Sequence, residues 1–233
     1  MKEILINVRE ELLKNKEEKK RLERFFKEEV NILGVKTTTV NKISTKYFKL
    51  IKNKSKKEIF SLCEELFKSG ILEECFIACN WAYNLRKNYE KKDFEIFEKW
   101  VDLYITNWAV CDSFCTRTMS EVIIRFPEVM LKLKLWTKSN NRWVRRAVAV
   151  SLIGLAKKGL CLKDIFEITD MLLLDQDDLV QKGYGWLLKV ASKVYQREVF
   201  EYVLNKKEIM PRTSLRYAIE KMPKELKEIA MKR

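Results

Sequence analysis

Helix-breaking residues are rare in this chain, and their scarcity limits the folds that it can adopt. Six glycines and three prolines are spread over 233 residues, so few positions favour the backbone conformations that interrupt a helix. Leu, Lys, Glu, Ile and Ala are abundant, a balance that suits long helices joined by short turns. The sequence therefore predicts an all-α chain and argues against a β-rich fold.

Clusters of turn-forming residues mark the places where the chain is expected to reverse direction. These clusters are Ser69-Gly70, Phe126-Pro127, Ser139-Asn140-Asn141, Asp175-Gln176-Asp177-Asp178 and Met210-Pro211. Pro127, Pro211 and Pro223 each fit the first turn of a helix. Between these marks the pattern predicts helices at about residues 40–53, 56–69, 71–90, 93–105, 109–125, 127–135, 141–158, 162–174, 178–194, 197–206, 211–221 and 223–232.

The N-terminal region is expected to differ from this regular pattern. Residues 3–32 are predicted to form one or two charged amphipathic helices. A break follows at residues 33–36, and the cluster Thr37-Thr38-Thr39 suits the cap of the next helix.

Short turns between successive helices also predict how the helices pack. Helices joined in this way become antiparallel neighbours, and stacked pairs of them form a curved solenoid. We therefore expect one domain over residues 1–233, a HEAT-like solenoid of antiparallel helix pairs with a concave basic surface. The helices of residues 1–55 are expected to pack as a cap on the repeats.

The charge of the chain favours a polyanionic partner. Lys and Arg number 47 against 33 Asp and Glu, which gives a net charge of +14, so nucleic acid or an anionic membrane surface is the expected partner. No apolar run is long enough for a signal peptide or a membrane span. No predicted helix sets an aromatic face opposite a lysine face, which argues against a membrane role. We expect a cytoplasmic protein, a monomer, that binds nucleic acid.

Cysteine and histidine usage argues against metal chemistry. The six cysteines lie in mostly apolar, helical surroundings and form no Cys-x-x-Cys knuckle. They are Cys63, Cys75, Cys79, Cys111, Cys115 and Cys161, and we expect buried thiols outside any disulfide. The absence of histidine removes imidazole ligands and every histidine-based triad. We therefore expect neither a metal nor a cofactor.

Basic residues are concentrated in one stretch that lacks acids. Between Val129 and Lys163 there are nine basic residues and no acidic ones, which favours a phosphate-binding edge over an ordinary mixed surface. The nine are Lys132, Lys134, Lys138, Arg142, Arg145, Arg146, Lys157, Lys158 and Lys163. Arg142 and Arg146 lie one turn apart near a predicted helix start, which suits a phosphate. A solvated basic face without a ligand is the alternative.

A carboxylate in an apolar stretch is the strongest candidate for chemistry. In the segment 106–115, Asp112 follows Trp108 by four residues, so the two share one face of a helix. Trp186 lies near Gly183 and Gly185, which would let another group approach the backbone closely. The alternative is that both tryptophans belong to the core and that Asp112 pairs locally, with Arg146 among the possible partners.

Three runs of the sequence resemble the motifs of the DNA alkylation repair family of AlkD-like DNA glycosylases, in the family's order. They are Asn107-Trp108-Ala109-Val110-Cys111-Asp112-Ser113, Arg142-Trp143-Val144-Arg145-Arg146-Ala147 and Gln181-Lys182-Gly183-Tyr184-Gly185-Trp186. The resemblance extends to Leu33-Gly34-Val35-Lys36-Thr37 and to the helix at Pro211-Arg212. Two positions depart from it. Phe25-Phe26 stands where some members carry tyrosine, and Thr38 stands where proline is common.

The resemblance implies an activity and a set of roles. The family hydrolyses the N-glycosidic bond of purines alkylated at N3 or N7 in duplex DNA, on a surface of HEAT-like repeats and without extruding the lesion. It implies that Asp112 is the catalytic carboxylate and that Trp108 and Trp186 face the alkylated nucleotide. It further implies that Arg146 contacts the DNA backbone, with Arg142, Arg145 and Lys182 in support.

Two other functions remain open from the residues. One is a non-catalytic HEAT-like module that binds DNA or RNA, which would show the same salt dependence without a product. The other is a scaffold whose basic face meets an acidic protein.

The glycosylase function requires no general acid, because a cationic purine is already a good leaving group.

Overall fold

The computed structural model describes residues 2–16, 24 and 26–232, and these form an all-α structure. The predicted fold class is thereby confirmed. Within the described residues the one β-type contact recorded is an isolated parallel bridge between Asn31 and Ile71. No helix in the described part of the chain is long and apolar enough to cross a membrane.

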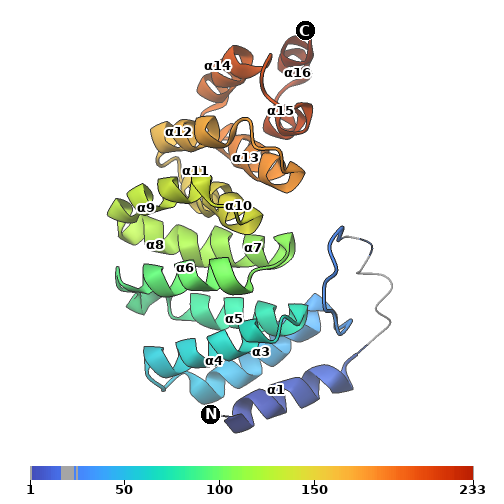
Figure 1. The fold of residues 1–233 in the computed structure, drawn as a ribbon, viewed down its shortest axis with the longest axis vertical. Coiled ribbons are helices and arrows are strands. Elements are labelled where there is room, and N and C mark those ends of the chain that lie inside the picture. The colour runs from blue at the N-terminus through green and yellow to red at the C-terminus, as the bar shows by residue number, and fades with distance from the viewer. Residues whose placement is uncertain (1, 17–23, 25, 233) are drawn as a thin grey trace. The chain divides into compact units, whose positions relative to one another are not determined.

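The chain divides into two compact units, Met1–Phe114 and Cys115–Arg233. The first unit contains α1 (Lys2–Lys14), α3 (Thr37–Ile51), α4 (Lys56–Lys68), α5 (Leu72–Asn84), the 3-10 turn η1 (Arg86–Asn88), α6 (Asp93–Tyr104) and α7 (Trp108–Phe114). Figure 1 shows these helices following one another in chain order. The single 1–233 domain with an N-terminal cap stays a prediction.

The second unit begins with the π-helix η2 (Cys115–Met119) and α8 (Ser120–Arg125). It continues with η3 (Pro127–Val129), α9 (Met130–Leu135), η4 (Trp136–Lys138), α10 (Arg142–Ser151), α11 (Ile153–Lys157), α12 (Leu162–Leu172), α13 (Asp178–Ala191), α14 (Gln196–Lys206), α15 (Arg212–Ile219) and α16 (Lys224–Met231). The predicted helices from residue 40 onward agree with these within a few residues. Three predicted helices are interrupted: the one at 71–90 ends at Asn84, the one at 109–125 contains the π-helix η2, and the one at 141–158 is divided at Leu152.

An aromatic cluster forms the centre of the first unit. Phe60, Phe67, Phe97, Trp100 and Phe114 are buried, and the ring centroids of the pairs among them that touch are 5.3 to 6.0 Å apart. Such aromatic pairs in tilted and edge-to-face geometry add stability beyond their buried area. Phe114 is the last residue of α7, so the cluster fixes the helix that carries Trp108 and Asp112.

The prediction of helices over residues 3–32 is only partly correct. Helix α1 ends at Lys14, and residues 26–36 have no helical structure; residues 17–23 and 25 lie outside the described part. Just beyond residue 32, in the predicted break, the buried Glu73 carboxylate accepts the backbone N–H groups of Leu33, Gly34 and Val35 at 2.8 to 3.0 Å. These hydrogen bonds tie the non-helical segment to α5 and satisfy its buried donors. Gly34 has φ 93°, which only glycine adopts readily.

A second carboxylate fastens the N-terminal helix to α5. The guanidinium of Arg9 in α1 donates to both oxygens of Glu74, at 3.0 to 3.2 Å, and Glu74 is 1% exposed. Bidentate pairs of this kind fix orientation as well as distance. The predicted threonine cap of α3 is wrong: the N-cap residue is Lys36, without a side-chain capping hydrogen bond, and the threonine cluster forms the first turn of the helix.

Of the two glycines of α13, Gly185 allows the close approach that the sequence predicted, and Gly183 does not require it. A Cβ on Gly185 would lie 2.7 Å from Tyr217 Cβ and 2.9 Å from the Ser214 carbonyl oxygen, so α13 and α15 approach more closely there than alanine would permit. A Cβ on Gly183 would lie 3.5 Å from Arg146 Cγ. Glycine at position 185 therefore lets α13 and α15 pack closely, whereas Gly183 leaves room for a methyl group beside the Arg146 side chain.

Candidate functional site

Helix α7 carries Trp108 and Asp112, and Asn107 sets where it begins. Asn107 is 2% exposed, and its Oδ1 accepts the Val110 N–H at 3.0 Å, which caps the helix. Trp108 is the first residue of α7 and Asp112 lies one turn later, so both lie on one face. Both side chains are half-buried. The helical geometry predicted for this pair is confirmed, while their roles stay predictions.

Phe26 covers part of Trp108. The two rings stack with centroids 5.4 Å apart and planes at 26°. Phe26 comes from the irregular segment 26–36, whose far end is held by Glu73. The sequence pointed to this position only as one where some family members carry tyrosine. A contact between residues so distant in the chain has no local signal.

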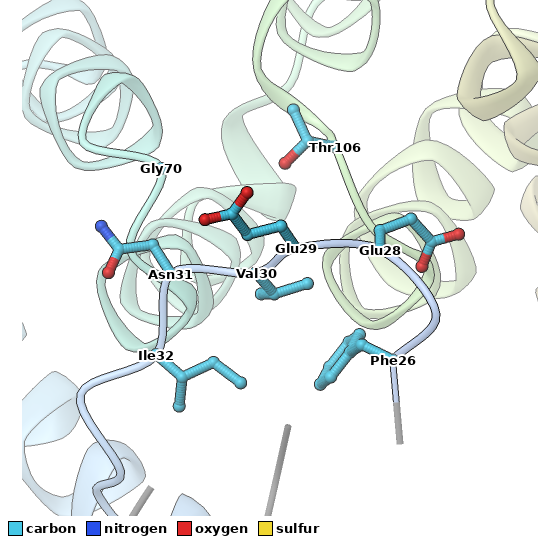
Figure 2. Close-up of a pocket in the computed structure, with 8 residues that line it drawn as sticks. All are labelled: Phe26, Glu28, Glu29, Val30, Asn31, Ile32, Gly70 and Thr106. Atoms are coloured by element: carbon cyan, nitrogen blue, oxygen red, sulfur yellow. The ribbon is translucent and has the colours of Figure 1, made fainter. Parts of the chain in front are cut away.

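A cavity lies beside this aromatic pair, in the first unit. Its volume is about 740 Å³, and Figure 2 shows the residues that line it: Phe26, Glu28, Glu29, Val30, Asn31, Ile32, Gly70 and Thr106. In Figure 2 the Glu29 carboxylate and the Val30 side chain lie on opposite sides of the backbone. Thr106 precedes Trp108 by two residues, so the cavity adjoins the start of α7.

In the second unit, α10 and α13 begin at one common edge. Asn141 Oδ1 accepts the Trp143 N–H at 2.9 Å and caps α10, while the Asp177 carboxylate accepts the Leu179 and Val180 N–H groups and caps α13. Arg142 Nε lies 2.9 Å from Asp177 Oδ2 and joins the two helix starts. We call this surface the helix-start edge.

The four basic residues predicted to bind DNA gather at the helix-start edge, and each has a partner within the protein. Arg145 donates to the Asp175 carboxylate at 2.6 and 3.3 Å and to the carbonyls of Ser139 and Asn140. Lys182 lies 3.0 Å from Asp178, and Arg142 pairs with Asp177.

Arg146 is the most enclosed of the four. It is 5% exposed, and its guanidinium donates to the Leu179 carbonyl while its side chain packs over Gly183. An enclosed guanidinium with a fixed partner holds a defined orientation.

The acidic residues that follow the basic stretch were not predicted to be its ion-pair partners. Between Asp164 and Gln181 there are six acidic residues and no basic ones. Besides the pairs above, Lys134 lies 2.8 Å from both Asp164 and Glu167. The signal was present in the sequence, as an acidic stretch one helix after a basic one. Pairing across successive helices therefore neutralises part of the charge that was expected to face a ligand.

Trp186 lies in the same helix as Lys182, one turn later, and is half-buried. Trp186 and the four basic residues belong to the 115–233 unit, whereas Trp108 and Asp112 belong to the 1–114 unit. Each group has the helical placement that its motif predicted.

The described residues show no metal-binding cluster of three or more suitable side chains. Five cysteines are buried and Cys161 is partly exposed, and none of the six forms a disulfide. Burial raises the pKa of the Cys75 thiol to about 12 and that of Cys63 further still. The expectation of buried thiols is confirmed for all but Cys161.

Comparison with known proteins agrees with this arrangement. A predicted DNA alkylation repair enzyme from Enterococcus faecalis superposes with a TM-score of 0.77 at 16% identity, over 88% of this chain and 94% of that chain, which shows a shared fold. No curated protein matches the chain. The family model described as DNA alkylation repair enzyme matches residues 8–222, nearly the whole sequence. The chain therefore belongs to the DNA alkylation repair enzyme family.

Proposed function

We propose that this protein is a DNA glycosylase that hydrolyses the N-glycosidic bond of cationic N3- or N7-alkylated purines in duplex DNA. Family membership supports a role in DNA repair. The observation that carries the finer proposal is the pairing of Trp108 and Asp112 on one face of α7, both half-buried. An aromatic face one turn from a carboxylate supplies two groups that a cationic lesion requires.

The chemistry follows from the charge of the substrate. An alkylated purine leaves as a neutral base, so its departure needs no proton donor. Positive charge then develops on the sugar, and the Asp112 carboxylate stabilises that oxocarbenium-like state and orients the attacking water. The Trp108 ring, one turn from Asp112, attracts the cationic base through its π face; for Trp186 the same role is what the family resemblance implies. Neither step requires histidine or a metal.

The basic residues of the helix-start edge would hold the DNA backbone. Arg142 and Lys182 are about a third exposed, at 34% and 30% of their side-chain surface, so both can reach phosphates by exchanging a carboxylate partner for one. Arg146 and Arg145 are more enclosed, so their contribution would come from a fixed guanidinium direction. The dipoles of α10 and α13 also favour anions at the same edge, because both helices begin there.

The decisive experiment measures release of 3-methyladenine and 7-methylguanine from methylated duplex DNA. Asp112→Asn should lower the single-turnover rate at least a hundredfold, the scale of losing one electrostatic group, and leave the affinity for DNA within a few fold. Asp102→Asn, on the exposed face of α6, is the matched control and should release base at the wild-type rate. Unimpaired release by Asp112→Asn would refute the proposal. DNA binding without release by the wild type would favour the non-catalytic module.

A further inference from the structure

Four exposed lysines lie at the edge of the second unit opposite the helix-start edge. Lys157 and Lys158 end α11, Lys163 lies in the first turn of α12, and Lys193 follows α13. The Tyr195 hydroxyl donates to the Gly159 carbonyl at 2.6 Å, so the loops that carry these lysines touch. We call this surface the lysine edge.

The two edges are separated by the length of a helix. Helices α10 and α13 run in the same direction, because their starts meet at the Arg142–Asp177 pair and the ends of α11 and α13 meet at Tyr195 and Gly159. Helix α13 has 14 residues, which span roughly 21 Å. Figure 1 shows these helices in successive positions within the unit. The lysine edge is therefore a different surface from the one that the family motifs mark.

The lysine edge also differs in how its charge is balanced. None of the four lysines forms an ion pair with another described residue, whereas Arg142, Arg145 and Lys182 each have a carboxylate partner. Asp164, the residue after Lys163, pairs with Lys134 at 2.8 Å. Glu198, five residues after Lys193 in the sequence, is an exposed acid in the first turn of α14.

The helix dipole explains the position of only some of the four lysines. Lysines near the C-terminal ends of α11 and α13 interact favourably with the helix dipoles, an effect of about 0.3–1 kcal/mol each that salt screens. Lys163 is at the start of a helix, where the dipole disfavours it. Four exposed ammonium groups on loops that touch at one point give this edge a positive charge that a row of phosphates would complement.

We propose that the lysine edge is a second DNA-binding surface, which contacts phosphodiester groups about one helix length away from the helix-start edge. Lysine is a point charge on a flexible stem, so it suits sequence-independent backbone contacts. The DNA substrate of the family identifies the polyanion. The contact does not depend on base chemistry, and unmodified duplex is sufficient to detect it.

The test compares two triple variants with the same change in net charge. Lys157→Gln, Lys158→Gln and Lys193→Gln remove three of the four lysines of the edge. Lys221→Gln, Lys224→Gln and Lys227→Gln, on or beside α16, are the control. Affinity for unmodified duplex is measured against salt concentration. Each phosphate contact contributes about 0.9 to the slope of log affinity against log salt concentration. The edge variant should therefore lose about 2 to 3 from the magnitude of that slope, and the control should keep the wild-type value.

Equal slopes in the two triple variants would overturn the proposal. A lower melting temperature of the edge variant with an unchanged slope would also overturn the proposal. That result would mean that the lysines only stabilise the ends of their helices and do not contact DNA. In the wild type, DNA should protect Lys157, Lys158 and Lys193 from acetylation more than Lys221 and Lys224. Because these measurements use unmodified DNA and no base release, they are independent of the glycosylase proposal.

Discussion

Two glycines in α13 are expected to respond oppositely to the same substitution. In a helix interior alanine is more stable than glycine by about 0.5–1 kcal/mol. At Gly183 the added Cβ would find its nearest neighbours at 3.5 to 3.7 Å, all of them side-chain atoms at ordinary contact distance. Gly183→Ala should therefore raise the free energy of unfolding by roughly the full helix gain.

At Gly185 the same methyl group would overlap α15. It would lie 2.7 Å from Tyr217 Cβ and 2.9 and 3.0 Å from backbone atoms of Ser214. Since backbone cannot rotate away, α15 must move, at a cost of about 1–3 kcal/mol. That shift also weakens the 2.8 Å hydrogen bond between Tyr184 and Ser214, a loss of about 1 kcal/mol. The two variants should differ by roughly 2–4 kcal/mol.

Urea denaturation followed by circular dichroism measures this difference, and amide exchange in α13 and α15 shows where it acts. Faster exchange should appear in both helices of Gly185→Ala and in neither helix of Gly183→Ala. A Gly185→Ala protein as stable as Gly183→Ala would refute the reasoning, since it would mean that α15 adjusts without loss.

Two further predictions concern Glu64 and Phe26. Desolvation opposes ionisation of Glu64, but hydrogen bonds donated by three side chains of α6 lower its pKa to about 2. Ionised Glu64 therefore stabilises the folded protein fully above the ordinary pKa of 4.5, and this stabilisation is lost as pH falls toward about 2. The difference in unfolding free energy between wild type and Glu64→Gln should shrink over that window in urea titrations. A constant difference would contradict the assignment. Phe26→Ala should strengthen binding of DNA with a cationic purine by about three- to tenfold in fluorescence anisotropy, because an aromatic pair worth about 0.5–1.5 kcal/mol no longer covers Trp108. Weaker binding would instead make Phe26 part of the binding surface, and Phe26→Leu is the control for lost volume.

The sequence predicted most helices of this fold because their limits are local. Ser55, Asn141 and Asp177 cap helices through side chains that lie next to the turns they close, so a reader of the sequence has all the information nearby. The π-helix after Phe114 was not predicted, since its wider turns leave the apolar pattern of one long helix almost unchanged.

The errors arose where distant residues decide the structure. The predicted helix extended to residue 32, yet residues 26–32 form no helix, and just beyond them Glu73, about forty positions away in the sequence, holds the N–H groups of Leu33, Gly34 and Val35. The stacking of Phe26 on Trp108 is likewise a contact between remote segments. For the candidate site, the motifs predicted which residues share a helix face, but they could not show that the basic groups are already paired with the acids of the following stretch.

The hydrogen bonds from Glu73 hold the backbone of residues 33–35 without depending on their side chains. The carboxylate accepts hydrogen bonds from main-chain N–H groups, which every residue except proline has. Among these three residues the positive φ constrains Gly34 alone to be glycine. The side chain presented to Trp108 can consequently change while the backbone keeps its course. A single internal carboxylate thus fixes the course of the segment, and the side chain at position 26 can be exchanged without removing any of the hydrogen bonds that hold that course.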